Sequence, residues 1–172
     1  MAWDNTMPLD FQDGQGVDEG DLDPIVKNLN SLRNAAVLVG GFVRTTTAGP
    51  TSGATELVGI TTPTLSLEAN STYKVELWGQ HHVDTAASAF TWQMRQDNIS
   101  GAVLGAQAHW RADDTGIGYV AWVVAYVVTT VAVSRAFVGT LVRVVGTGTA
   151  TIRANTSLTV WRVGSDSVLT FG

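Results

Sequence analysis

The densest group of possible metal ligands in the chain is the run His81-His82-Val83-Asp84. Neighbouring side chains on a β-strand point to opposite faces, so His81 and His82 could bind one ion together only across a bulge. His82 and Asp84 would share a face, and His109 could join them from an adjacent strand to complete the three protein ligands of a zinc site. Histidines at a strand end are more often ordinary surface residues. We therefore expect no metal and no cofactor.

Other side chains offer little support for catalysis. No serine lies in a Gly-x-Ser-x-Gly elbow, and a chain without cysteine has neither a thiol nucleophile nor a disulfide. Two carboxylate pairs, Asp113 with Asp114 and Glu68 with Glu76, could serve a glycosidase. The first pair, however, lies in Ala-Asp-Asp-Thr-Gly, which is typical of a turn. The glycine patterns of phosphate-binding loops are missing too. We expect a protein that is not an enzyme.

Tryptophan is the second residue type with recognisable chemistry, and the chain contains six. Five of them, Trp78, Trp92, Trp110, Trp122 and Trp161, fall within predicted strands. On an exposed face they could stack on sugar rings, whereas buried they would anchor a core or a subunit interface. The second use is the commoner one, so a carbohydrate-binding module is kept as an alternative.

Charge is distributed unevenly along the chain. Residues 1–23 contain seven acidic residues and no basic one, whereas residues 24–172 contain eight acidic and ten basic residues. The net charge of −5 argues against non-specific binding of nucleic acid. The first residues also lack the basic and apolar regions of a secretion signal. We expect an acidic arm with a short helix over residues 1–34 and a β domain over residues 35–172.

The end of the arm has the features of a helix. Asp23 and Pro24 suit its first turn, and the apolar residues that follow form one stripe. So short a helix is not stable alone, so it must dock on its own β domain, a sister subunit or a larger assembly. The predicted capsid-anchoring surface combines this stripe with apolar residues of the arm: Trp3, Leu9, Phe11, Ile25, Leu29 and Leu32.

From residue 35 onward, short apolar or alternating runs are separated by turns rich in Gly, Asn and Asp. Tyr73, Val75 and Leu77, for example, alternate with polar neighbours as in a half-buried strand. The pattern predicts strands over residues 36–45, 54–61, 65–69, 72–80, 87–96, 102–110, 118–129, 135–145, 148–154 and 157–163. Such regular short strands indicate an all-β, antiparallel β-sandwich of jelly-roll type.

A long uncharged run extends from Ile117 to Val133. Its length is at the lower limit for a membrane helix. Its β-branched residues, the Thr129-Thr130 interruption and the absence of basic flanks favour a long strand followed by a turn. We therefore expect no membrane partner. A strand that is apolar on both faces packs against a sister subunit as well as a sheet, and the predicted oligomer interface is Tyr119, Trp122, Val124 and Tyr126.

Several segments resemble virion proteins of tailed bacteriophages. Many such proteins start with a short polar arm that ends in a helix. This chain resembles those starts in the segments Asp10 to Gly14, Val17 to Leu22 and Leu29 to Asn34. The sandwich attached to such starts in phages of actinobacteria resembles Leu65 to Val75, Trp92 to Gln96 and Leu141 to Ile152. The His81-His82 pair departs from that pattern, in which small polar residues are expected.

The resemblance implies a structural virion protein with a tumour-necrosis-factor-like jelly roll, a fold that forms trimers. We expect a capsid decoration or minor capsid protein, a homotrimer bound to the major capsid protein. It should lie on the outer capsid surface, because packaged DNA would repel an acidic arm. A tail protein or fibre-like appendage of the same virion is the alternative. No nucleic-acid partner is expected.

Overall fold

The computed structural model describes residues 36–46, 48–111 and 118–165, and in these ranges the chain is built from β-strands. The strands are β1 (Val37–Val43), β2 (Ala48–Ser52), β3 (Leu57–Thr61), β4 (Leu65–Leu67), β5 (Ser71–Val83), β6 (Ala89–Gln96), β7 (Val103–Arg111), β8 (Gly118–Thr129), β9 (Val133–Arg135), β10 (Phe137–Val145), β11 (Ala150–Arg153) and β12 (Ser157–Ser165). The predicted all-β class is confirmed. The predicted arm and helix over residues 1–34 lie outside the described residues.

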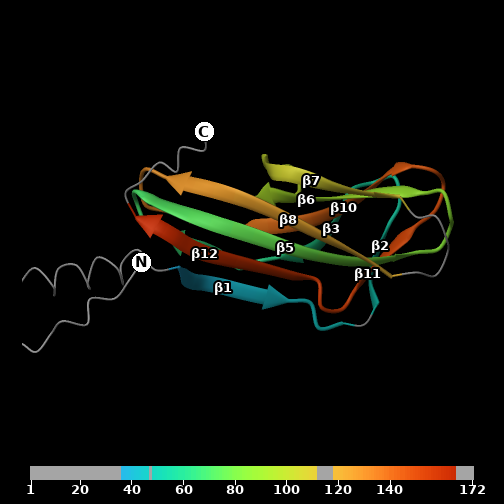
Figure 1. The fold of residues 1–172 in the computed structure, drawn as a ribbon, viewed down its shortest axis with the longest axis horizontal. Helices are drawn as coiled ribbons and strands as arrows, with labels where there is room; N and C mark the ends of the chain where they lie inside the picture. Colours follow the sequence, from blue (N-terminus) through green and yellow to red (C-terminus); the bar gives the residue numbers. More distant parts are fainter. Residues whose placement is uncertain (1–35, 47, 112–117, 166–172) are drawn as a thin grey trace, which may run out of the picture.

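The first sheet, which we call sheet 1, is organised around the long strand β5. One edge of β5 pairs with β8, and its other edge pairs with β12 and then β11, so that Ser157 lies opposite Trp78 and Ile152 opposite His81. β1 and β2 border β12 and β11 in the same way. Sheet 1 therefore has four strand positions, and two of them are occupied by pairs of collinear strands (Figure 1).

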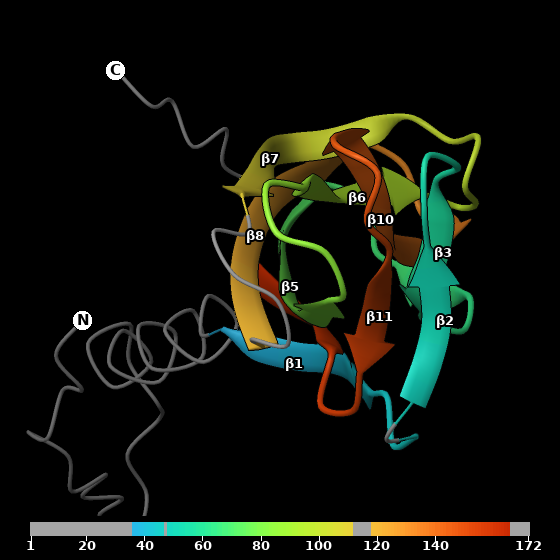
Figure 2. The same ribbon diagram turned by 90° about the vertical axis from the view of Figure 1, so that its right-hand side faces the viewer.

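The second sheet, sheet 2, has the order β3-β10-β6-β7, and β4 and β9 form a separate two-stranded ribbon. We count β1 with β2, and β11 with β12, as one strand each and leave the β4–β9 ribbon aside. The chain then passes from one sheet to the other at every connection except the β6–β7 hairpin. This is the strand order of a jelly roll, as the sequence predicted. Seen from the end, the two sheets curve around one core (Figure 2).

The core lies between the inner faces of the two sheets and is centred on Trp92 of β6, which is fully buried. Its indole lies flat over Gly79 of β5, where an added Cβ would come within 2.4 Å of the ring. A glycine is thus required at this point of the strand by close packing rather than by backbone conformation. β5 presents Tyr73, Val75 and Leu77 to the same core, which confirms the predicted alternation.

The observed strands depart from the predicted ones in several places, among them β9 (Val133–Arg135), which was not predicted as a separate strand. Residues 48–52, which we expected to form a turn, are β2, and β5 continues beyond the predicted end at residue 80 to Val83. The uncharged run behaves as expected, because β8 covers Gly118–Thr129 and a bend follows it. In the described part of the chain no helix is long and apolar enough to cross a membrane.

Candidate functional site

The outer face of sheet 1 carries seven of the fifteen large hydrophobic residues that are exposed in the described domain. Alternate residues of β8 point outward here. The strands that follow it across the sheet, β5, β12 and β1, add side chains that point to the same face. We call this surface the apolar face and define it by its members: Leu38, Val43, Trp78, Val120, Trp122, Val124, Tyr126, Val128 and Trp161. Most of them are about half exposed, with Val120 at 46% and Val128 at 59%.

A pair of tryptophans occupies the middle of the apolar face. Trp78 and Trp122 lie directly opposite each other on β5 and β8, with ring centroids 5.9 Å apart and an angle of 25° between the rings. They are 47% and 57% exposed. A cross-strand aromatic pair stabilises the pairing of its two strands. Half of each indole nevertheless remains available to a partner molecule.

The charged groups on the middle of this face neutralise each other. Lys74 lies 2.8 Å from Glu76 on the same strand. The hydrogen bond to Glu76 raises the pKa of Lys74, so Lys74 stays charged at neutral pH. Lys74 lies between Trp161 and Tyr126 in the register of the sheet. A partner approaching the face therefore meets aromatic and aliphatic surface with no net charge.

The outer face of sheet 2 has the opposite character. Glu56 accepts hydrogen bonds from Gln93, Arg95 and Thr140, at 2.6 Å from Gln93 and from the Nε of Arg95. Gln107 extends this network by donating to Gln93 at 2.6 Å. Burial opposes ionisation of Glu56, but the hydrogen bonds from Arg95, Thr140 and Gln93 outweigh it and lower the pKa of the carboxyl. These groups satisfy each other, so sheet 2 offers a partner few open polar contacts.

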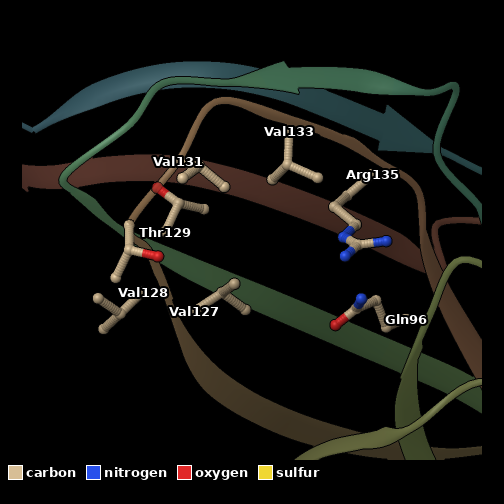
Figure 3. A pocket seen from close by; sticks show the side chains of 8 residues that line it. Gln96, Val127, Val128, Thr129, Val131, Val133 and Arg135 are labelled. Atoms are coloured by element: carbon tan, nitrogen blue, oxygen red, sulfur yellow. The ribbon is translucent and has the colours of Figure 1, made fainter.

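A shallow pocket of about 210 Å³ lies beside the end of β8. Its apolar walls come from Val127, Val131 and Val133, and Gln96 and Arg135 line its polar side (Figure 3). The guanidinium of Arg135 is held by Asp97 at 2.8 Å. The pocket therefore presents a paired charge, a few uncharged polar groups and aliphatic side chains.

The histidines are not arranged as a metal site. His81 points into the core and His82 points outward, as their adjacent positions predicted. Asp84 accepts two hydrogen bonds from Thr149, and His109 lies on β7 with its Nδ1 2.7 Å from the hydroxyl of Thr91. Among the described residues no three histidine, aspartate or glutamate side chains form a group that could hold a metal ion.

The structure brings together three of the four residues of the predicted oligomer interface. Trp122, Val124 and Tyr126 lie on the apolar face, but Tyr119 lies on the inner side of β8 against His81 and Trp110. Strand alternation shows the reason, because residue 119 has the opposite parity to the other three. The six predicted anchoring residues, from Trp3 to Leu32, lie outside the described part.

The sequence analysis missed several members of the apolar face. Val120 and Val128 lie an even number of residues from Trp122 on the same strand. Strand alternation alone was therefore sufficient to place them on the apolar face. Leu38, Val43 and Trp161 come from strands far away in the sequence. Only the pairing of β1 with β12, of β12 with β5 and of β5 with β8 places them on the same face as the β8 residues.

No family model matches the chain, and no curated protein matches it. Solved structures with a similar fold include the Eiger TNF of S. frugiperda, at 9% identity and a TM-score of 0.42, covering 63% of this chain and 69% of that one. T=1 particles derived from infectious bursal virus match at 12% identity and a TM-score of 0.47, covering 76% of this chain and 32% of that one.

A third similar structure is the CBM22-1-GH10 portion of xylanase 10B from Clostridium thermocellum. It matches at 14% identity and a TM-score of 0.38, covering 80% of this chain and 27% of that one. The chain therefore spans about a third or less of the viral and xylanase chains. A fold alone does not select a function, which must be argued from the apolar face.

Proposed function

We propose that this protein is a structural component of a virion: a capsid decoration or minor capsid protein that binds the outer surface of a phage head as a homotrimer and stabilises it. The observation that carries the proposal is the apolar face. An uncharged aromatic surface on a domain whose polar groups bind one another suits permanent assembly better than turnover of a small molecule. The resemblance of the arm and sandwich segments to phage virion proteins supports the same role.

The size of the apolar face supports self-association. Seven of its side chains are between 46% and 59% exposed. Together they present on the order of 700 Å² to solvent, which exceeds the ~300–600 Å² of the largest apolar patch on a typical monomer and approaches the ~800 Å² that each partner contributes to a standard interface. Burying that area provides on the order of 10 kcal/mol per subunit, enough to offset much of the entropy lost on association.

Three copies are proposed because the resembling jelly rolls form trimers and capsid lattices of tailed phages offer three-fold positions. A closed ring covers the face of every subunit and stops growth, whereas an open head-to-tail contact would produce fibres. A docked helix stripe from the chain's own arm is the competing occupant of the face. Removal of the arm distinguishes the two, because a trimer built through the sandwich survives it.

The arm supplies the proposed contact with the major capsid protein. Its seven acidic residues disfavour the inner surface, where packaged DNA lies, and favour the outer one. Trp3, Leu9 and Phe11, with the stripe of Ile25, Leu29 and Leu32, are proposed as the anchoring residues. No nucleic acid and no membrane is required by this arrangement.

Quantitative mass spectrometry of purified virions tests the proposed location. A decoration protein is expected at hundreds of copies per particle, in proportion to the major capsid protein. A handful of copies would instead support the alternative, a tail or fibre-like appendage. Complete absence from the particle would contradict both.

A second candidate function is carbohydrate binding, and the exposed Trp78–Trp122 pair is the observation that favours it. Indole rings half open to solvent are suited to stacking on sugar rings. Binding of the protein to a glycan array, lost in Trp78→Ala but kept in the buried-face control Tyr119→Phe, would support this function. Unchanged glycan binding in Trp78→Ala, or no binding by the wild type, would exclude the pair as a sugar platform.

A further inference from the structure

His81 is an unusual residue for the interior of a sandwich. It lies on the inner side of β5, is fully buried, and is surrounded by aromatic rings from two other strands. The ring centroids of Tyr119, Phe90 and Trp92 lie 5.6, 5.9 and 6.2 Å from that of the imidazole. The surroundings are therefore apolar on the β6 side and phenolic on the β8 side.

The hydrogen bonding of the ring fixes its protonation state. The indole N–H of Trp92 donates to Nδ1 of His81 at 3.0 Å. An indole can only donate, so Nδ1 must be unprotonated and the proton of the neutral ring lies on Nε2. Nε2 is buried and has no hydrogen-bond partner in the described part of the protein. The neutral ring thus makes only one of its two possible hydrogen bonds. In the charged ring Nδ1 would carry a proton as well, so that its N–H would face the N–H of the Trp92 indole.

Few groups near His81 could compensate a positive charge. On its own strand the nearest titratable group is His82, which would repel it. From β8 the facing titratable group is the phenol of Tyr119. The neighbours from β6 and β11 are Phe90, Trp92 and Ile152, which carry no charge.

We propose that His81 is an acid-sensitive lock of the sandwich: its imidazole stays neutral while it accepts the hydrogen bond from Trp92 and takes up a proton only when β5 separates from β6 and β8, so that acid weakens the sandwich and thereby releases assembled subunits. The loss of sandwich stability follows from His81 alone. The release of subunits rests in addition on the proposed function, because β8 carries the apolar face on its opposite side.

The direction of the pH dependence follows from linkage. Burial, and secondly the charge of His82, lower the pKa of His81 from 6.5 to about 4. Between these two pH values the unfolded chain therefore binds a proton at His81 that the folded chain does not bind. The stabilising effect of the neutral ring is complete above about pH 7 and falls as the pH drops, with the folding equilibrium constant decreasing on the order of 100-fold by about pH 4.

Urea unfolding of the full chain, followed by tryptophan fluorescence from about pH 7 to about pH 4.5, tests this lock. Asn is the informative replacement, because its amide oxygen can accept from Trp92 near the position of Nδ1 but does not titrate. The wild-type midpoint should fall across this window and that of His81→Asn should stay nearly flat. The outward-facing control His82→Asn should still fall, slightly less steeply than the wild type, because burial is the larger cause of the lowered pKa of His81. The carboxyls of Glu56 and Asp84, whose pKa values are lowered, lose their stabilising effect only below this window.

A flat wild-type midpoint, or equal slopes in wild type and His81→Asn, would overturn the proposal. If His81→Asn does not fold, nitrogen NMR of the wild-type imidazole decides instead. The lock requires an Nε2–H tautomer that stays neutral until the protein unfolds, and a folded ring that titrates near 6.5 would contradict it. Sedimentation at both ends of the pH range tests subunit release separately, and particle incorporation is not needed for any of these measurements.

Discussion

Trp78 and Trp122 face each other across the β5–β8 pair, with ring centroids 5.9 Å apart and half of each indole open to solvent. The same two strands carry the buried His81 and the half-buried Tyr119 on their inner side. One pair of strands thus carries both the centre of the proposed interface and the proposed pH-sensitive group. A change on either side can be measured as a change in assembly.

Replacement of Trp122 by serine should weaken self-association. A large aromatic residue at the centre of an interface usually contributes about 2 kcal/mol or more, so the dissociation constant should rise by about 30-fold or more. Sedimentation velocity over a dilution series measures this constant. An unchanged constant would show that the pair lies outside the interface.

A matched pair of valine substitutions tests which of the two sheets forms the interface. Val128 on the apolar face and Val145 at the end of β10 are almost equally exposed, at 59% and 57%. Val128→Ser should weaken assembly, whereas Val145→Ser should leave it unchanged, because β10 belongs to sheet 2. Equal effects of the two substitutions would contradict assembly through sheet 1.

Gly79→Ala should destabilise the sandwich, because the new methyl group would come within 2.4 Å of the buried Trp92 indole. Overpacking of this kind costs about 1–3 kcal/mol in the free energy of unfolding. Gly164→Ala is the control, since an added Cβ there has no neighbour within 4 Å. Urea titration should show a lower midpoint only for Gly79→Ala, and equal midpoints would contradict the close packing.

Glu56→Gln should destabilise the domain at neutral pH by about 1–3 kcal/mol, because it weakens the hydrogen bonds that hold Arg95. The folded pKa of Glu56 lies below its ordinary value of 4.5, so its contribution is complete above that pH and fades as the pH falls further. The wild type and the variant should therefore converge in acid. Glu68→Gln is the control, because its exposed pair with Arg162 contributes about 0–1 kcal/mol.

Deletion of residues 1–23 tests the role of the arm. The truncated protein should remain folded and self-associated but should no longer join particles, since the proposed anchoring residues Trp3, Leu9 and Phe11 are gone. Circular dichroism and sedimentation check the first expectation, and mass spectrometry of particles checks the second. Wild-type occupancy of the truncated protein would mean that the arm does not anchor it.

The sequence predicted the parts of this fold that depend on local pattern. The alternation from Tyr73 to Gln80 and the uncharged run of β8 were sufficient to place two central strands. β2 was missed because Gly49 and Pro50 are typical of turns, and only pairing with β11 makes the segment a strand. An edge strand is the position in a sheet where proline is tolerated.

The candidate site was less predictable, for a related reason. Alternation separates His81 from His82, and the shared parity of His81 with Leu77 already points it toward the core. What alternation cannot provide is the identity of the neighbours. The contacts of His81 with Trp92 and Tyr119, and the placement of β8, β12 and β1 residues on one face, are set by pairing between distant segments.

Sedimentation equilibrium of the isolated full-length protein at micromolar concentration tests most directly whether sheet 1 is an assembly face. The account predicts a species of about 55 kDa, three times the 18.2 kDa of the chain, that shifts toward the monomer in Trp122→Ser. A wild-type protein that stays at 18.2 kDa across that range would contradict it.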